Sequence, residues 1–153
     1  MPVPNHRILF VCSGNTSRSV MAAAWFNAAC RERGLAGLEA EAAGINSPDG
    51  APIAPEAMAV LEERHILPER LGRRRLTAKA VLRADLVVAM TEQHRERLVE
   101  AFPRLHLRVV ALMAFAKGGD RHVADPVGGG VEAYRACLDQ MQPALEAILD
   151  EWA

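Results

Sequence analysis

The order of apolar and turn-forming segments predicts an α/β fold, with a four-stranded parallel sheet between two layers of helices. Short apolar segments alternate along the chain with longer segments that repeat apolar residues at helical spacing. The first apolar segment, RILFVC at 7–12, is typical of a strand that is covered on both faces. Because the chain has 153 residues, the size of one domain, we expect a single domain over 1–153.

Four segments are predicted to form strands. ADLVVAM at 84–90 is nearly as apolar as the first segment, whereas LEAEAAG at 38–44 is weaker, because alanine and glutamate are uncommon in strands. Right-handed crossovers bring the carboxyl ends of parallel strands to one end of the sheet, where ligands bind at a switch in strand order. The predicted strands are 7–12, 38–44, 84–90 and 107–112.

Helices are predicted at 18–33, from Pro55 onward, at 78–83, at 93–102 and at 131–152. Gly34 can end the first of them, because glycine adopts the left-handed conformation that commonly follows a helix. Proline is favoured in a first helical turn, so Pro55 opens the second. Thr91 can cap the helix that follows the third strand. A glycine-rich loop at 115–130 precedes the last helix.

The composition limits the classes of function. A formal net charge of −1 does not provide the concentrated basic face of a nucleic-acid-binding protein, so we expect no nucleic-acid partner. The apolar segments are too short for a membrane span, and the first residues do not resemble a secretory signal, so we expect a cytoplasmic protein without a membrane partner. The three cysteines, Cys12, Cys30 and Cys137, do not have the spacing of a disulfide framework or zinc site.

The loop after the first strand has the properties of an oxyanion-binding cradle. It leads into a helix, whose first N–H groups and positive dipole end favour an anion. Small side chains allow its backbone to wrap around a ligand, and Arg18 adds a fork of donors suited to two phosphate oxygens. The small residues of the loop are Ser13, Gly14, Asn15, Thr16 and Ser17.

Cys12 is the candidate nucleophile. The same helix end and Arg18 favour the thiolate form of a nearby cysteine, and a thiolate that faces a bound phosphoryl group can attack phosphorus. Ser19 could donate a hydrogen bond to the sulfur. The alternative is a structural thiol at a strand end, but the five-residue spacing between Cys12 and Arg18 favours catalysis.

These residues resemble a known family. VCSGNTSRS at 11–19 is similar to the active-site loop of the low-molecular-weight protein tyrosine phosphatases, and the similarity continues in AAGI at 42–45, in 84–98 and in DPVGGGVEAY at 125–134. The resemblance implies that Cys12 forms a cysteinyl-phosphate, that Arg18 and the loop bind the phosphoryl oxygens, and that phosphate or a similar oxyanion occupies the site. It implies supporting roles for Asn15 and Ser19, and no metal or other cofactor.

The resemblance also assigns the general acid to Asp125. The chemistry agrees, because an oxygen leaving group is poor unless it is protonated, and a carboxyl beside a bound anion keeps its proton more readily. Pro126 and the glycines after it place Asp125 on a loop, where a simple turn aspartate is the alternative.

The resemblance implies a phosphorylated protein as substrate, with phosphotyrosine as the default. Val127, directly after Asp-Pro, is small where tyrosine phosphatases of this family have an aromatic or large apolar side chain. Thr16 resembles the protein arginine phosphatases, which have threonine where tyrosine-specific members tend to have isoleucine. Phosphoarginine is therefore the alternative substrate.

Two further alternatives are weaker. Arsenate reductases use a similar cradle but need closely spaced resolving cysteines, whereas Cys30 and Cys137 lie on separate predicted helices among apolar residues. A non-catalytic phosphate-binding module is favoured only if Cys12, Arg18 or Asp125 is replaced, and all three are present. Ser17 stands where most of the family has a second cysteine, so the usual disulfide within the loop cannot form.

Overall fold

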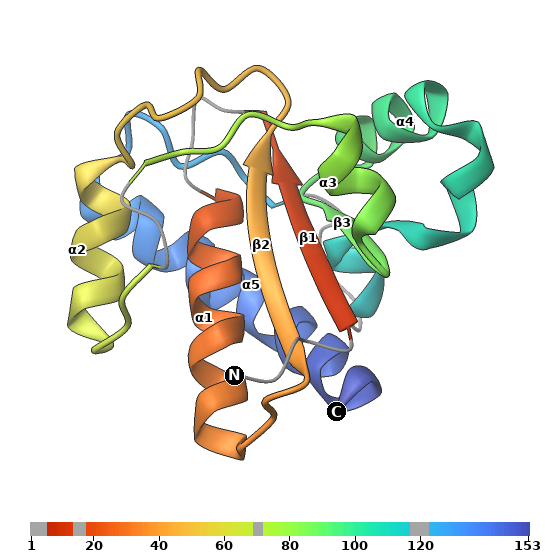
Figure 1. Ribbon diagram of the computed structural model, residues 1–153. Helices are drawn as coiled ribbons and strands as arrows, with labels where there is room; N and C mark the ends of the chain where they lie inside the picture. The colour runs from red at the N-terminus through yellow and green to blue at the C-terminus, as the bar shows by residue number, and fades with distance from the viewer. Residues whose placement is uncertain (1–5, 14–17, 69–71, 117–122) are drawn as a thin grey trace.

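The computed structural model describes residues 6–13, 18–68, 72–116 and 123–153, and its secondary structure has the predicted alternation of strands and helices (Figure 1). In chain order the elements are β1 (His6–Cys12), α1 (Arg18–Arg33), β2 (Leu38–Gly44), α2 (Pro55–Glu63), α3 (Ala78–Arg83), β3 (Leu86–Ala89), α4 (Glu92–Ala101), the 3₁₀ helix η1 (Pro103–Arg108), β4 (Val109–Ala111), the 3₁₀ helix η2 (Leu112–Phe115) and α5 (Gly130–Trp152).

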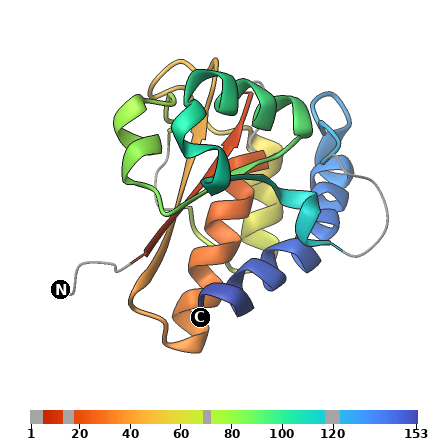
Figure 2. The ribbon, with the colours of Figure 1, turned by 90° about the vertical axis from the view of Figure 1, so that its right-hand side faces the viewer.

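The four strands form one parallel sheet in the order β2-β1-β3-β4. Figure 1 shows α1, α2 and α5 on one side of this sheet and α3 and α4 on the other, and Figure 2 shows the same arrangement after a quarter turn. The predicted three-layer α/β fold is therefore confirmed. Because the chain passes from β2 across β1 to β3, the switch in strand order lies between β1 and β3, directly beyond Cys12.

Alternate residues of β1 enter two different hydrophobic cores. Ile8, Phe10 and Cys12 belong to the larger core, which α1, α2 and α5 cover. Leu9 and Val11 belong to the smaller core, formed with residues of α3, α4 and the other strands. Successive side chains of a strand point to opposite faces. The Cys12 thiol therefore lies on the same side of the sheet as Ile8 and Phe10.

The predicted helix ends are confirmed. Gly34 has a φ of +69°, a conformation that costs glycine little, and it ends α1. Pro55 is the first residue of α2. The hydroxyl of Thr91 accepts a hydrogen bond from the backbone N–H of His94 at 3.1 Å and so caps α4.

Two predicted strands are shorter than expected. β3 comprises Leu86–Ala89 rather than 84–90, and β4 comprises Val109–Ala111 rather than 107–112. The second difference has a local cause, because Pro103 begins a 3₁₀ helix that continues to Arg108 and occupies the first residues of the expected strand. Among the described residues, no helix combines the length and the apolar character needed to cross a membrane.

Candidate active site

Cys12 is the last residue of β1, and only 1% of its surface is exposed. The segment that follows β2 continues alongside it. The backbone N–H of Ile45 donates to the Cys12 carbonyl, and that of Asn46 donates to the Ser13 carbonyl, each at 2.8 Å. The backbone of the candidate nucleophile is thereby fixed before the predicted oxyanion loop begins.

The first turn of α1 contains two predicted site residues, and one of them contacts the thiol. Ser19 is 2% exposed, and its Oγ lies 2.9 Å from Cys12 Sγ, within hydrogen-bond distance. Arg18 is the first residue of α1 and is 4% exposed, which is unusual for an arginine. The remaining predicted loop residues, Gly14, Asn15, Thr16 and Ser17, lie outside the described residues.

Arg18 links this first turn to the segment that contains Asp125. Its Nη1 donates to the backbone carbonyl of Val123 at 2.6 Å. The backbone N–H of Val123 donates in turn to the carbonyl of Met90, the residue after β3, at 3.2 Å. The chain two residues before Asp125 is thus attached both to the candidate oxyanion-binding arginine and to the carboxyl end of the sheet.

Asp125 itself is exposed, and its carboxylate accepts a hydrogen bond at Oδ1 from the backbone N–H of Val127 at 3.0 Å. The preceding residue has partners on α5. The N–H of Ala124 donates to Gln140 Oε1 at 3.4 Å, and its carbonyl accepts from Cys137 Sγ at 3.8 Å. The backbone around Asp125 is therefore held by several bonds, while its carboxyl group faces solvent.

The glycines after Asp125 allow the chain to turn directly into α5. Gly128 and Gly130 have φ values of +85° and +73°, which other residues rarely adopt. A Cβ on Gly129 would lie 2.5 Å from the Cβ of Ala133, too close for any side chain. The glycine-rich loop expected from the sequence is therefore a short turn at this point, followed at once by the helix that holds Ala124.

Two further cysteines, Cys30 and Cys137, are also buried. Burial raises the pKa of Cys137 to about 12, and the nearby Arg18 only partly opposes this. Burial also raises the pKa of Cys30 to about 11, against the opposing charges of Arg31 and Arg33. Both side chains are therefore neutral thiols at physiological pH, as expected for structural cysteines.

His94 lies near the site, although the sequence indicated no role for it. It is 8% exposed, and its Nδ1 is buried without a hydrogen-bond partner in the described structure. Burial lowers the pKa of His94 to about 4, Arg18 and Arg97 act in the same direction, and Asp125 opposes them. The imidazole is therefore neutral at physiological pH, and it lies within electrostatic range of both Arg18 and Asp125.

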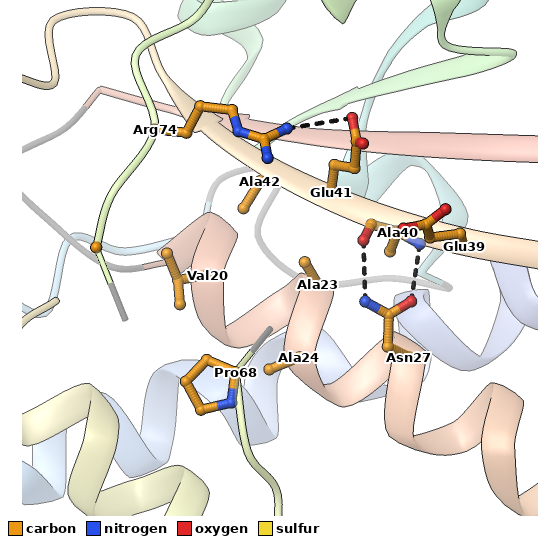
Figure 3. Close-up of a pocket in the computed structure, with 11 residues that line it drawn as sticks. Val20, Ala23, Ala24, Asn27, Glu39, Ala40, Glu41, Ala42, Pro68 and Arg74 are labelled. Atoms are coloured by element: carbon orange, nitrogen blue, oxygen red, sulfur yellow. Dashed lines mark hydrogen bonds and ion pairs between the residues drawn. The ribbon is translucent and has the colours of Figure 1, made fainter. Parts of the chain in front are cut away.

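A cavity of about 100 Å³ lies beside the edge strand β2 rather than over Cys12 (Figure 3). Figure 3 shows Asn27 of α1 pointing to β2, where its side chain bonds to the N–H and C=O of Ala40 at 2.8 and 2.9 Å. The lining of this cavity also includes Val20, Ala42 and Arg74. It includes none of the predicted catalytic residues, so we do not assign the reaction to it.

The structure brings Cys12 and Ser19 into contact, and Arg18, the residue before Ser19, bonds to Val123, two residues before Asp125. No group of three histidine, cysteine, aspartate or glutamate side chains that could hold a metal ion occurs in the described parts of the chain. Sequence reasoning missed the surrounding residues His94, Gln140 and Ser47. The one available indication of their proximity to the site was that Ser47 and His94 follow the ends of strands and that Gln140 lies on α5.

Comparisons with known proteins show the family of the chain. The family model for low molecular weight phosphotyrosine protein phosphatase matches residues 7–153. The chain is 35% identical to a protein-arginine-phosphatase of Geobacillus stearothermophilus, over 95% of each chain. It is 34% identical to a low molecular weight protein-tyrosine-phosphatase of Streptomyces coelicolor, over 94% of this chain and 92% of the other. A crystal structure of the low molecular weight protein tyrosine phosphatase of T. tengcongensis superposes with a TM-score of 0.87 at 33% identity, over 95% and 99%.

Proposed function

Because the chain belongs to the low-molecular-weight phosphotyrosine protein phosphatase family, a family of cysteine-dependent hydrolases, we propose roles for three residues. Cys12 is the nucleophile, Arg18 binds the phosphoryl oxygens, and Asp125 is the general acid. The observation that supports this most strongly is the contact of Cys12 Sγ with Ser19 Oγ at 2.9 Å, next to a buried arginine that bonds to the Asp125 segment.

In the first step the Cys12 thiolate attacks phosphorus, and the bond from phosphorus to the leaving atom of the substrate breaks. Asp125 donates its proton to that atom, so the side chain does not leave as an anion. Negative charge develops on the equatorial oxygens, and the guanidinium of Arg18 and the N–H groups of the loop before α1 stabilise it. The step yields a cysteinyl-phosphate and a dephosphorylated side chain.

In the second step a water molecule attacks the phosphorus of the cysteinyl-phosphate. Asp125, now a carboxylate, accepts a proton from this water, and the sulfur–phosphorus bond breaks. The hydrogen bond from Ser19 stabilises the departing thiolate. Inorganic phosphate is released, and the enzyme returns to its starting protonation state. No metal or other cofactor takes part in either step.

Phosphoarginine in proteins is the substrate that the observations favour, and phosphotyrosine is the second candidate. Val127 is 51% exposed beside Asp125 and offers little surface to a phenol ring. All seven aromatic side chains lie among the described residues, and none of them is exposed. Relatives in Geobacillus stearothermophilus and Bacillus subtilis, 35% and 33% identical, are named protein-arginine-phosphatases. Thr16 is consistent with this, because the resemblance described above associates threonine at this position with the protein arginine phosphatases.

The first experiment tests catalysis itself. We expect the enzyme to hydrolyse p-nitrophenyl phosphate at mildly acidic pH and the Cys12→Ser variant to lose at least about 10³-fold of the rate. The Cys30→Ser variant is the matched control and keeps the rate, since Cys30 is a neutral buried thiol. Background release from all three proteins would contradict the proposal and favour a phosphate-binding module.

The second experiment tests the substrate. Rates on peptides with phosphoarginine and with phosphotyrosine are compared for the unaltered enzyme, Thr16→Ser and Thr16→Ile. We expect Thr16→Ile to lower the phosphoarginine rate relative to the phosphotyrosine rate by about tenfold, as one added apolar group does in a specificity pocket. Thr16→Ser keeps the hydroxyl and should keep the ratio. An unchanged ratio in Thr16→Ile would show that Thr16 does not set the preference.

A further inference from the structure

A second, much smaller cavity adjoins the candidate nucleophile. Cys12, Ser19, Ser47 and Arg73 contribute to its lining, and its volume is about 10 Å³. A water molecule needs about 10–15 Å³ of such volume together with two to four polar partners. The cavity therefore has room for one water molecule, and it is too small for a phosphate ion.

Ser47 supplies the observation that points to a ligand. Its side chain is 1% exposed, and its Oγ has no hydrogen-bond partner in the described structure. Buried hydroxyl groups are nearly always paired, with protein or with an ordered water molecule. The turn that carries Ser47 is anchored to the start of the oxyanion loop, because the N–H of Asn46 donates to the Ser13 carbonyl at 2.8 Å. Ser47 is therefore fixed at the wall of this cavity.

The hydroxyl of Ser19 requires a further partner for a related reason. A serine hydroxyl has one proton to donate and lone pairs that can accept two hydrogen bonds. To stabilise a thiolate, Ser19 must direct its single proton to Cys12 Sγ, which lies 2.9 Å from its Oγ. A donor on the other side of Ser19 Oγ would favour that orientation and strengthen the bond, because linked hydrogen bonds polarise one another.

We propose that one water molecule occupies this cavity, accepts a hydrogen bond from the Ser47 hydroxyl and donates one to Ser19 Oγ. Ser47 is then a positioning residue, which acts on Cys12 through the water molecule and Ser19. The inference rests on the proposed role of Cys12 as nucleophile. Both steps of the reaction benefit, because the same bond stabilises the attacking and the departing thiolate.

Water can reach this position from the side of β2. Val20, Ala42 and Arg74 line both the small cavity and the larger one in Figure 3, so the two are adjacent. The larger cavity has a volume of about 100 Å³ and lies beside the edge strand. The small cavity therefore adjoins a larger one that can supply water.

The experiment measures the rate at which iodoacetamide alkylates Cys12 as a function of pH. Cys30 and Cys137 are neutral thiols at neutral pH because their pKa values are raised to about 11 and about 12, and Cys12→Ser gives their background. We expect Ser47→Ala to lower the alkylation rate near pH 6 by about threefold and to move the midpoint of the profile to higher pH, as the loss of one ordinary hydrogen bond predicts. The matched control is Thr77→Ala, which removes the hydroxyl that caps α3 and should leave the profile unchanged.

A folded Ser47→Ala variant with the profile of the unaltered enzyme would overturn the inference. If Ser47→Ala does not fold, a high-resolution crystal structure of the unaltered enzyme decides: a water molecule within hydrogen-bond distance of Ser47 Oγ and Ser19 Oγ supports the inference, and a direct protein partner for Ser47 refutes it. Alkylation reports on the sulfur whether or not the protein hydrolyses a phosphate ester. A failure here is thus distinct from a failure of the proposed reaction.

Discussion

The two halves of the candidate site are built in opposite ways. On the nucleophile side, Cys12, Arg18 and Ser19 are each at most 4% exposed, and their side chains lie at the junction of β1 and α1. On the acid side, Asp125 is exposed, and its place in the molecule depends on hydrogen bonds to the backbone of its neighbours Val123 and Ala124.

This difference follows from what each half must do. A thiolate gains from fixed donors in a protected site, where hydrogen bonds to it are stronger than in water. A general acid gives its proton to the leaving group in the first step and takes one from the attacking water in the second, so its carboxyl needs access to both substrate and water. Arg18 belongs to both halves, since its side chain lies in the first and bonds to the second.

The largest effect is expected where the two halves meet. Arg18→Lys replaces a planar fork by a single ammonium group, which cannot bind two phosphoryl oxygens and the Val123 carbonyl together. We expect kcat for p-nitrophenyl phosphate to fall by about 10³-fold. The control is Arg33→Lys, at the other end of α1, where the arginine pairs with Asp150 at the surface. Equal activities of the two variants would show that Arg18 does not act on the phosphoryl group.

The acid side alone is tested by Asp125→Asn. The amide oxygen can still accept the Val127 hydrogen bond, so the turn is kept while the transferable proton is lost. We expect kcat to fall by about 10²-fold on a phosphotyrosine peptide and by less on p-nitrophenyl phosphate, because p-nitrophenol leaves more easily without protonation. Asp139→Asn, on the exposed face of α5, is the control. An equal loss on both substrates would contradict the assignment of Asp125 as general acid.

A third prediction concerns His94, which lies within electrostatic range of both halves, and its effect on how the free energy of unfolding depends on pH. The folded protein lowers the pKa of His94 from 6.5 to about 4, so between these pH values the unfolded chain binds a proton that the native protein excludes. The free energy of unfolding therefore falls as the pH falls through this window, by about 2 kcal/mol between pH 6.5 and pH 4.5. His94→Gln should remove this part of the decrease.

The measurement is urea unfolding at pH 6.5 and pH 4.5. The control is His106→Gln, since His106 is an exposed histidine that bonds only to the nearby Pro103 carbonyl. If His94→Gln and His106→Gln lose the same stability between the two pH values as the unaltered protein, His94 is not the buried neutral group described above.

The smallest effect is expected for one of the bonds that hold the acid side. Gln140→Ala removes the acceptor of the Ala124 N–H, a bond of 3.4 Å. We expect kcat to fall about threefold with little change in KM, the effect of one weak hydrogen bond on the position of the acid. Gln142→Ala, whose side chain bonds to Arg64 and Glu146 instead, should leave kcat unchanged. If the two variants have the same kcat, the Gln140 bond is not needed to position Asp125, and the bonds of Arg18 and Cys137 to this segment are enough.

The same contrast explains how much could be predicted from the sequence. Helix ends were predictable because their causes are local, as for the hydroxyl of Thr91 and the positive φ of Gly34. The nucleophile side was predictable because strand, loop and helix follow one another within a dozen residues. The predicted start of β4 was wrong, because the chain from Pro103 to Arg108 forms a 3₁₀ helix that includes the first residues of the expected strand.

The supports of the acid side could not be predicted in this way. Arg18 and Val123 are 105 residues apart, and a backbone carbonyl acceptor leaves no pattern in the sequence. His94 and Ser47 became relevant only when the strand order placed their segments beside β1 and β3. The roles of Gly14, Asn15, Thr16 and Ser17 stay predictions, since these residues lie outside the described part of the chain.

The amide of Asn27 acts on β2 as a neighbouring strand would. Its oxygen accepts a hydrogen bond from the N–H of Ala40, and its nitrogen donates one to the Ala40 carbonyl. One side chain therefore pairs both backbone polar groups of a residue on the edge strand β2. An unprotected outer strand is a template on which a second copy of a chain can add and begin to aggregate. A single asparagine on α1 therefore contributes to keeping the molecule separate from its copies at high concentration.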